Sequence, residues 1–307
     1  MGRLYILDRF LHIIVNQQSR NSAHNFKALL LELSKYTNKY KIHQTKNIEQ
    51  LKSLFQLLKG TLKEEDMIVF VGGDGSLNQG LTLLEELEIL NIIGYIPSGS
   101  GNDFARTHGI PNKIQDSLAY LFQVKEPREL SVIHAHEGLT NYYAVNSMGF
   151  GIDGLVNYVI AQKKRDKGSG SMTYLTSALS AFKRLESFPI TLKVDGGVFQ
   201  FNRAQIGLVV NNPYFGGGLK IIPEASSEDD VLEVLIAEDA NFKDLVSILA
   251  RMVINKSHLK NKKLSLFKTK SIALYIDSNQ YGQKDGEIIH QDGYALTIQT
   301  KKKLFWL

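Results

Sequence analysis

The sequence predicts an α/β protein in two parts. The first is an N-terminal domain built on a parallel β-sheet, and the second is a C-terminal domain of antiparallel strands in a β-sandwich. Three observations predict this class. The chain has 307 residues, which is more than one hydrophobic core usually organises. Its first third alternates short β runs with segments of helical periodicity, and its later part is a series of β runs with turn signals.

The alternation in the first third has the order βαβαβαβ, which places strands in parallel and helices on both faces. Asn47 and Gln50 have the spacing of a capping box at a helix start, and Gly60 ends that helix. A third helix follows a glycine-rich turn and runs through Leu84 and Leu87. The expected strands are His12–Val15, Lys41–Thr45, Met67–Val71 and Asn91–Ile96, with apolar residues at helical spacing over Phe26–Leu33 and Leu51–Leu58.

The pattern changes after about residue 129. Asp195-Gly196-Gly197 joins two alternating runs and is a hairpin signal. One helix is clear, from Phe242 to Val253. We therefore predict domains at 1–129 and 130–295, with a tail at about 296–307 that returns to the first domain. The expected strands are Ile190–Val194, Val198–Phe201, Ile206–Val210, Leu232–Ala237, Leu264–Thr269, Ile272–Ile276 and Tyr294–Gln299.

Composition narrows the function classes. The chain has no cysteine, which excludes a thiol nucleophile and a cysteine zinc site. The formal charge of +5 includes basic clusters at 163–167, 260–263 and 301–303, which suit a solvated surface or an anionic lipid. No apolar run reaches the roughly 18 residues of a membrane span. We expect a cytoplasmic protein with peripheral membrane contact and no nucleic-acid partner.

Two glycine-rich loops lie where strands end and helices begin. One is Gly72-Gly73-Asp74-Gly75-Ser76-Leu77-Asn78, and the other is Pro97-Ser98-Gly99-Ser100-Gly101-Asn102-Asp103-Phe104-Ala105-Arg106. Glycine lets backbone approach a phosphate closely, and the N–H groups at a helix start favour an anion. The glycines alone could simply make tight turns. Two such loops after adjacent strands favour a phosphate site at the carboxyl edge of the sheet.

These loops resemble two motifs of the diacylglycerol kinase catalytic domain, a family of lipid kinases that includes sphingosine kinases and is related to NAD kinases. The resemblance continues in family order through most of the chain. It includes Asn146–Gly151, Asn211–Gly218, Pro223-Glu224-Ala225 and Lys284-Asp285-Gly286-Glu287. It implies an NAD-kinase/diacylglycerol-kinase-like α/β domain that binds nucleotide and a β-rich domain for the lipid acceptor.

The resemblance assigns nucleotide contacts residue by residue. ATP is the expected phosphoryl donor. The first strand departs from the family pattern at Gln17 and Arg20, where the family has proline and glycine. The residues expected at the nucleotide are Asn16, Ser19, Thr45, Gly72, Gly73, Asp74, Gly75, Ser76, Leu77, Asn78, Gly99, Ser100, Asn102 and Asp103.

The resemblance also implies catalytic and metal residues. Glu287 is the expected general base, with Asp285 beside it, although Asp-Gly is also an ordinary hairpin turn. A structural Mg²⁺ is expected at the side chain of Asp229 and the carbonyls of Ser226 and Val231. Two positions depart from the family: Asp230 replaces a glycine, and Ser131 replaces an aspartate. Whether another carboxylate such as Asp153 substitutes for that aspartate is open.

These observations predict an ATP-dependent lipid kinase that phosphorylates a lipid hydroxyl at the membrane surface, diacylglycerol to phosphatidic acid first. A sphingoid, glycerol-type or isoprenoid alcohol is also open as acceptor. The alternatives are an NAD-kinase-like or other soluble-alcohol kinase, and a member that binds nucleotide or lipid without turnover. The departures at Gln17, Arg20, Ser131 and Asp230 support the last alternative. The sequence leaves a homodimer open.

Overall fold

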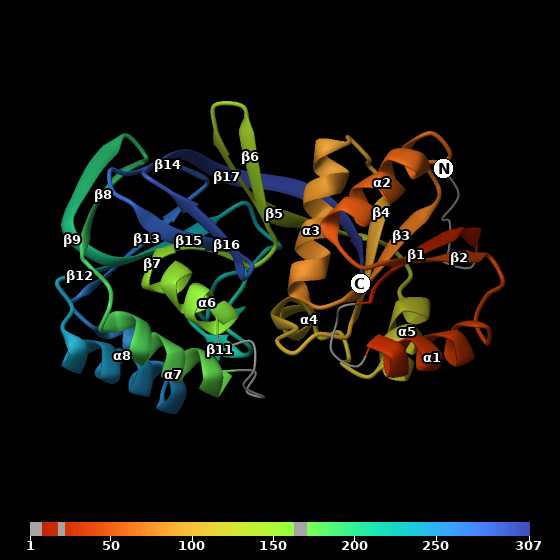
Figure 1. Ribbon diagram of the computed structural model, residues 1–307, viewed down its shortest axis with the longest axis horizontal. Helices are drawn as coiled ribbons and strands as arrows, with labels where there is room; N and C mark the ends of the chain where they lie inside the picture. The colour runs from red at the N-terminus through yellow and green to blue at the C-terminus, as the bar shows by residue number, and fades with distance from the viewer. Residues whose placement is uncertain (1–7, 18–21, 163–170) are drawn as a thin grey trace. The chain divides into compact units, whose positions relative to one another are not determined.

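The computed structural model describes residues 8–17, 22–162 and 171–307 (Figure 1). The chain divides into two compact units. The N-terminal unit comprises Met1–Leu130 with Lys302–Leu307, and the C-terminal unit comprises Ser131–Lys301. Two strands run across these boundaries, β5 (Arg128–Glu137) and β17 (Tyr294–Trp306).

The N-terminal unit is a parallel sheet with helices on both faces. Its strand order is β17-β4-β3-β1-β2, in which only the end of β17 takes part, pairing Phe305 with Ile93 and Trp306 with Gly94. One face carries α1 and α5, and the other carries α2 and α3. The elements are β1 (Leu11–Asn16), α1 (Ser22–Leu33), β2 (Tyr40–Thr45), α2 (Ile48–Lys59), β3 (Met67–Gly72), α3 (Asp74–Glu86), β4 (Ile92–Pro97), α4 (Asp103–His108) and α5 (Ile114–Gln123).

Local chemistry explains these elements. β3 is fully buried because every residue from Met67 to Gly72 lies between two helical layers. The Asn47 side chain caps α2 by accepting from Gln50 N, as predicted. The reciprocal bond differs, because the Gln50 side chain accepts from Lys46 N rather than from the cap residue. Trp306 is fully buried, and its ring N–H donates to the carbonyl of Leu121 at 3.1 Å.

The C-terminal unit is an antiparallel sandwich with helices on one side. The sandwich interior is an apolar core, and α6, α7 and α8 close a second core on the outer face formed by β9 and β12. Its elements are β6 (Thr140–Ala144), β7 (Ser147–Gly151), α6 (Ile152–Gln162), α7 (Ser171–Phe182), β8 (Phe188–Val194), β9 (Gly197–Val210), β10 (Tyr214–Phe215), β11 (Leu219–Lys220), β12 (Leu232–Glu238), α8 (Phe242–Ile254), a 3-10 turn (His258–Lys260), β13 (Leu264–Thr269), β14 (Ser271–Ile276), β15 (Gln280–Lys284) and β16 (Glu287–Gln291).

The predicted fold class is confirmed: a largely parallel N-terminal sheet is followed by antiparallel strands. The sequence missed β5, β6, β7, β15, β16 and the two-residue β10 and β11, and it divided the 14-residue β9 into two strands. The pairing of β9 with β12 has a register shift, because Ala237 of β12 pairs with Ile206 and the next residue, Glu238, pairs with Ala204. The alternation of buried and exposed residues in β9 breaks at the same place. In the part of the chain that the structure describes, no helix is long and apolar enough to cross a membrane.

Candidate functional site

The two glycine loops touch through their backbones. β3 and β4 are parallel neighbours, and the register pairs Gly72 with Pro97. A Cβ added to Gly99 would lie 2.4 Å from the Cα of Gly73, and a Cβ on Gly73 would lie 3.2 Å from the Cα of Gly99. Gly99 has no room for a side chain, and at Gly73 a Cβ would fit only if the facing backbone shifted slightly. The glycines therefore serve the contact between the loops as well as any ligand.

Asp74 joins the two loops through hydrogen bonds. It is the first residue of α3, and its carboxylate accepts from the N–H of Asp103 at 2.9 Å and of Phe104 at 3.0 Å. It therefore caps α4, the helix of the second loop, from the first loop. The Tyr95 hydroxyl of β4 donates to the carbonyl of Gly72, the last residue of β3, at 3.1 Å. Burial raises the pKa of Tyr95, and the nearby Asp74 and Asp103 raise it further, so this hydroxyl stays protonated and keeps donating.

Asn102 shapes the second loop from within. It takes a left-handed conformation with φ of 51°. Its side chain closes a ring with Gly99, accepting from Gly99 N at 3.0 Å and donating to Gly99 O at 3.1 Å. Its amide also donates to Asn112 at 3.0 Å. The sequence predicts Asn102 and Gly99 at the nucleotide, and in the structure the two residues are hydrogen-bonded to each other within the second loop.

A pocket of about 230 Å³ with a mixed polar and apolar lining opens beside the first loop. Its lining comes from the carboxyl ends of β1 and β2 and the starts of α2 and α3, and includes the predicted Asn16, Thr45 and Ser76 together with Lys46 and Gln79. The Asn16 side chain donates to Ser76 Oγ at 2.9 Å, which joins the first strand to the glycine loop. Ser19 and Arg20 lie outside the described residues.

Asn78 and Leu77 face inward from α3 and are fully buried. Within the described residues, neither amide atom of Asn78 has a hydrogen-bond partner. Buried amides are normally satisfied, so this pair of atoms is a strong exception. Gly73, Asp74, Gly75, Ser76, Gly99, Asn102 and Asp103 lie in or directly beside the two touching loops.

In the C-terminal unit, Asp285 is held by three amides. It sits in a tight turn between β15 and β16, with φ of 45° at Asp285 and 84° at Gly286. Its carboxylate accepts from the backbone N–H of Val145, of Asn146 at 2.9 Å and of Ser147 at 3.0 Å. These donors belong to the buried bend between β6 and β7. Asp285 therefore anchors the turn that presents Glu287.

Glu287 lies one residue beyond this turn. The ammonium of Lys284 donates to its carboxylate at 2.6 Å, across the turn. Lys284 is largely buried, whereas Glu287 keeps a quarter of its side chain exposed. The carboxylate is thus both oriented and accessible, as a group that meets a substrate must be.

A buried hydrogen-bond chain supports the turn from below, and sequence reasoning did not find it. Gln283 accepts from Gly286 N at 2.7 Å and donates to Asp153 at 2.6 Å. The Tyr174 hydroxyl donates to the other oxygen of Asp153 at 2.5 Å. Burial raises the pKa of Asp153, and the two hydrogen bonds oppose that rise. Gln283 and Tyr174 carry no motif signal, because glutamine and tyrosine are common in any core.

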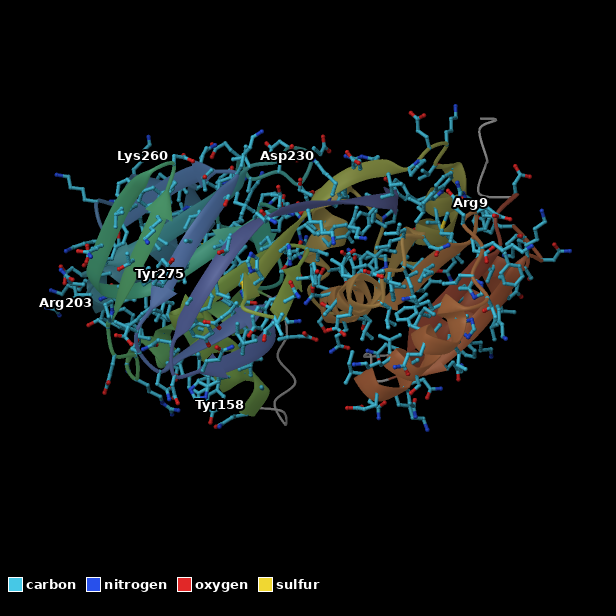
Figure 2. The ribbon with its side chains drawn as sticks, turned by 90° about the horizontal axis from the view of Figure 1, so that it is seen from above. Arg9, Tyr158, Arg203, Asp230, Lys260 and Tyr275 are labelled. Atoms are coloured by element: carbon cyan, nitrogen blue, oxygen red, sulfur yellow. The ribbon has the colours of Figure 1, made fainter. Side chains whose placement is uncertain are left out.

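The loop before β12 carries the expected metal residues. Asp229 is exposed, and its carboxylate accepts from Val231 N at 3.0 Å. The hydroxyl of Ser131 donates to the carbonyl of Asp229 and approaches the carboxylate of Asp230, which Figure 2 labels, at 3.4 Å. The carboxylate of Asp153 accepts hydrogen bonds from Tyr174 and Gln283, and not from residues of this loop. Oxygen ligands suit Mg²⁺ in kind, but among the described residues no group of three or more histidine, aspartate or glutamate side chains could hold a metal ion.

An apolar pocket with a cavity volume of about 70 Å³ lies between the helices and the sheet of this unit. Val156, Tyr174, Leu245, Ile248 and Met252 line it, with side chains of β9 and β12. Gln205 and His258 are buried polar residues of its lining, and the His258 Nε2–H donates to the carbonyl of Ile221 at 2.6 Å. Burial lowers the pKa of His258, so the ring is neutral at pH 7.

Comparisons with known proteins identify the family of the chain. The diacylglycerol kinase catalytic domain matches residues 11–135, and the YegS C-terminal NAD kinase beta sandwich-like domain matches residues 146–300. The chain belongs to the diacylglycerol kinase and lipid kinase family. The predicted family resemblance is therefore confirmed.

Individual relatives are distant. The chain is 24% identical over 292 residues to a protein of Bacillus subtilis (strain 168) named "Putative lipid kinase YtlR", a match covering 90% of this chain and 92% of the relative. It is 24% identical over 231 residues to the diacylglycerol kinase of the same organism, covering 75% and 73%. A solved structure described as a "putative diacylglycerol kinase" of Bacillus anthracis str. Sterne superposes with a TM-score of 0.78 at 22% identity, covering 96% of this chain and 94% of that one. The last likeness shows the fold alone.

Proposed function

We propose that this protein transfers the γ-phosphoryl group of ATP to the hydroxyl of a membrane lipid, with diacylglycerol as the first acceptor and phosphatidic acid as the product. The observation that carries the proposal is the pair of touching glycine loops locked by Asp74. Phosphoryl transfer needs mainly positioning and charge stabilisation, and a rigid cradle of backbone N–H groups at helix starts supplies both.

The nucleotide is assigned to the N-terminal unit. Its phosphates meet the loops from Gly72 to Asn78 and from Gly99 to Asp103. The pocket lined by Asn16, Thr45 and Ser76 has a volume of about 230 Å³ and receives part of the nucleoside. Ser19, which lies outside the described residues, stays an expected nucleotide contact.

Glu287 is assigned as the general base that takes the proton of the lipid hydroxyl. Asp285 positions it through the three backbone amides, and Gln283 supports the turn. Mg²⁺ would neutralise phosphate charge at the nucleotide. A second, structural Mg²⁺ would be held by the carboxylate of Asp229 and the carbonyls of Ser226 and Val231, whose oxygens fit a hard cation.

The lipid is assigned to the C-terminal unit. The apolar pocket beneath α6, α7 and α8 suits methylene groups, because an apolar cavity stays dry and favours an apolar guest. An acyl chain would enter it while the headgroup hydroxyl stays in water. The proposal includes a cytoplasmic location with peripheral contact at the membrane surface.

One observation favours a second candidate, a family member that binds nucleotide and lipid without turnover. The carboxylate of Glu287 is already paired with Lys284 at 2.6 Å, and that pair must open before Glu287 can accept a proton. The two candidates make different predictions about the same reaction mixture.

The test is incubation of the purified protein with γ-labelled ATP, Mg²⁺ and a panel of dispersed lipids, with NAD and nucleosides as soluble acceptors. Label on diacylglycerol supports the proposal. Label on another lipid alcohol keeps the reaction and changes the acceptor, and label on NAD overturns the lipid assignment. ATP binding without any labelled product would favour the non-catalytic candidate.

A further inference from the structure

Helix α8 carries apolar side chains on its solvent-exposed surface as well as on the side that packs against the unit. Leu245, Ile248 and Met252 point inward and line the apolar pocket. Beside this inner side, roughly a third of a turn around the helix, Phe242, Val246, Ala250 and Val253 are exposed and recur at i, i+4, i+8 and i+11. Residues at this spacing form one stripe along a helix. We call this stripe, together with the exposed Ile254, the α8 face.

The exposure of the α8 face is large for apolar side chains. Val253 is 57% exposed and Ile254 is 81% exposed, at the C-terminal end of the helix. Met172 on the neighbouring α7 is 70% exposed. Figure 1 shows α7 and α8 side by side along one side of the unit, and their contact includes the Phe182 and Phe242 rings, whose centroids lie 6.2 Å apart. A contiguous exposed apolar surface indicates an interaction site.

From position 242 onward, the charged residues of this stretch are mostly basic. Asp244 is the single acidic residue between positions 242 and 263, and its carboxylate accepts from the backbone N–H of Asn241 at the helix cap. Figure 2 shows Lys260 at the margin of the unit, with its side chain extending outward. The basic residues of this stretch are Lys243, Arg251, Lys256, Lys260, Lys262 and Lys263.

We propose that the α8 face docks on an anionic lipid bilayer, with Phe242, Val246, Val253 and Ile254 entering the interface and the surrounding cations contacting lipid headgroups. Apolar side chains ringed by lysine and arginine are the features by which helices lie in the plane of a membrane surface. A protein partner would fit the apolar stripe equally well. The excess of cations with one capped acid favours the anionic bilayer.

This inference rests on the proposed lipid kinase activity and extends it. The inner side of α8 lines the apolar pocket assigned to the acyl chain, so docking through the outer side would bring that pocket next to the bilayer. The lipid could then pass from the bilayer to the pocket without crossing bulk water. The α8 face thus acts on substrate supply and not on the chemical step.

The experiment is co-sedimentation of the full chain with vesicles of phosphatidylcholine and phosphatidylglycerol. The variant Val253→Ser/Ile254→Ser changes only exposed side chains and should keep its circular dichroism and melting temperature. We expect its vesicle affinity to fall by roughly tenfold or more. The matched control is Leu57→Ser on α2, a side chain that is 74% exposed in the N-terminal unit, and it should sediment like the unaltered protein.

A variant that removes two lysines tests whether binding depends on the negative charge of the lipid headgroups. Lys256→Gln/Lys260→Gln should lower affinity for anionic vesicles by about fivefold for each cation, because a lysine near an anionic surface contributes about that factor. Lys270→Gln, an exposed lysine outside this stretch, is the control. Unaltered protein that stays in the supernatant at low salt would overturn the inference, and so would equal sedimentation of the Val253→Ser/Ile254→Ser variant. Loss of self-association in that variant, with vesicle binding unchanged, would assign the face to a protein contact.

Turnover separates this inference from the proposed function. With a short-chain diacylglycerol dispersed without vesicles, the Val253→Ser/Ile254→Ser variant should match the unaltered protein, whereas with vesicle-borne diacylglycerol it should be slower by the same factor as its binding loss. If no lipid is phosphorylated by any form, the proposed function fails, and the sedimentation results still decide the docking. Equal slowing on both substrates would contradict a docking role.

Discussion

Replacing Asp285 by alanine should destabilise the C-terminal unit strongly, although the family resemblance places this residue among the catalytic ones. Its carboxylate accepts from three backbone N–H groups of a buried bend. Each buried donor left without a partner costs about 1–3 kcal/mol. Because Asp285 is itself half-buried, water can reach part of the vacated space, and the low end applies to each donor. We expect a loss of about 3 kcal/mol.

The assay is urea unfolding with two signals. Trp306 is the sole tryptophan and belongs to the N-terminal unit, so its emission reports that unit. Far-ultraviolet circular dichroism reports both units. With a urea dependence of about 2 kcal/mol per molar, the dichroism transition of Asp285→Ala should move down by about 1.5 M. Glu287→Gln, two residues away, keeps an acceptor for the largely buried Lys284 ammonium and should cost less than about 1 kcal/mol.

The outcome separates a positioning residue from one that is only reactive. If Asp285→Ala loses less than about 1 kcal/mol while activity disappears, the three amides are not its main partners, and the assignment of Asp285 as an anchor is refuted. If both variants lose activity and only Asp285→Ala loses stability, the division of roles between Asp285 and Glu287 stands.

Three further predictions concern other parts of the molecule. Gly99→Ala should lower the stability of the N-terminal unit by about 1–3 kcal/mol in Trp306 emission and weaken ATP binding, because the new Cβ would meet the Gly73 backbone, whereas Gly60→Ala should do neither. Burial lowers the pKa of His12 and lowers that of the stacked His43 to about 4. The charge of Lys41 lowers both pKa values, and Asp66 opposes the shift of His12. The unfolded chain therefore binds more protons between about pH 4 and 6.5, and stability falls as the pH drops through that window. His43→Gln should flatten this dependence in thermal melts, and an unchanged slope would contradict the cause. Tyr174→Phe should destabilise the C-terminal unit by about 2 kcal/mol, and less at low pH, because the lost hydrogen bond serves the charged form of buried Asp153; a pH-independent loss in dichroism melts would contradict this.

Periodicity was enough to predict the N-terminal sheet. Its strands are short apolar runs such as Met67–Gly72, and its helices carry one apolar face each, so period and burial agree. The strands that were missed lack that agreement. β7 is Ser-Met-Gly-Phe-Gly, and β15 is Gln-Tyr-Gly-Gln-Lys. Glycine and glutamine have low β propensity, and only pairing with neighbouring strands makes these segments extended.

The candidate site divides in the same way. The glycine loops were predictable because close backbone approach leaves glycine as the residue that fits, as Gly73 and Gly99 show. The support around Glu287 was not predictable. Gln283 and Tyr174 act through contacts far apart in the chain, and local spacing carries no information on such contacts. Sequence also could not show that Ser131 bonds to the loop of Asp229 and Asp230.

The central claim is that Glu287 accepts a proton from a lipid hydroxyl during phosphoryl transfer from ATP. The most direct measurement is the rate at which γ-labelled ATP labels diacylglycerol, compared between the unaltered protein and Glu287→Ala, with ATP affinity measured in both. The account predicts a rate lower by about 10²–10⁴-fold at unchanged ATP affinity. A loss of less than about fivefold in a folded variant would contradict it, since a general base contributes far more than that factor.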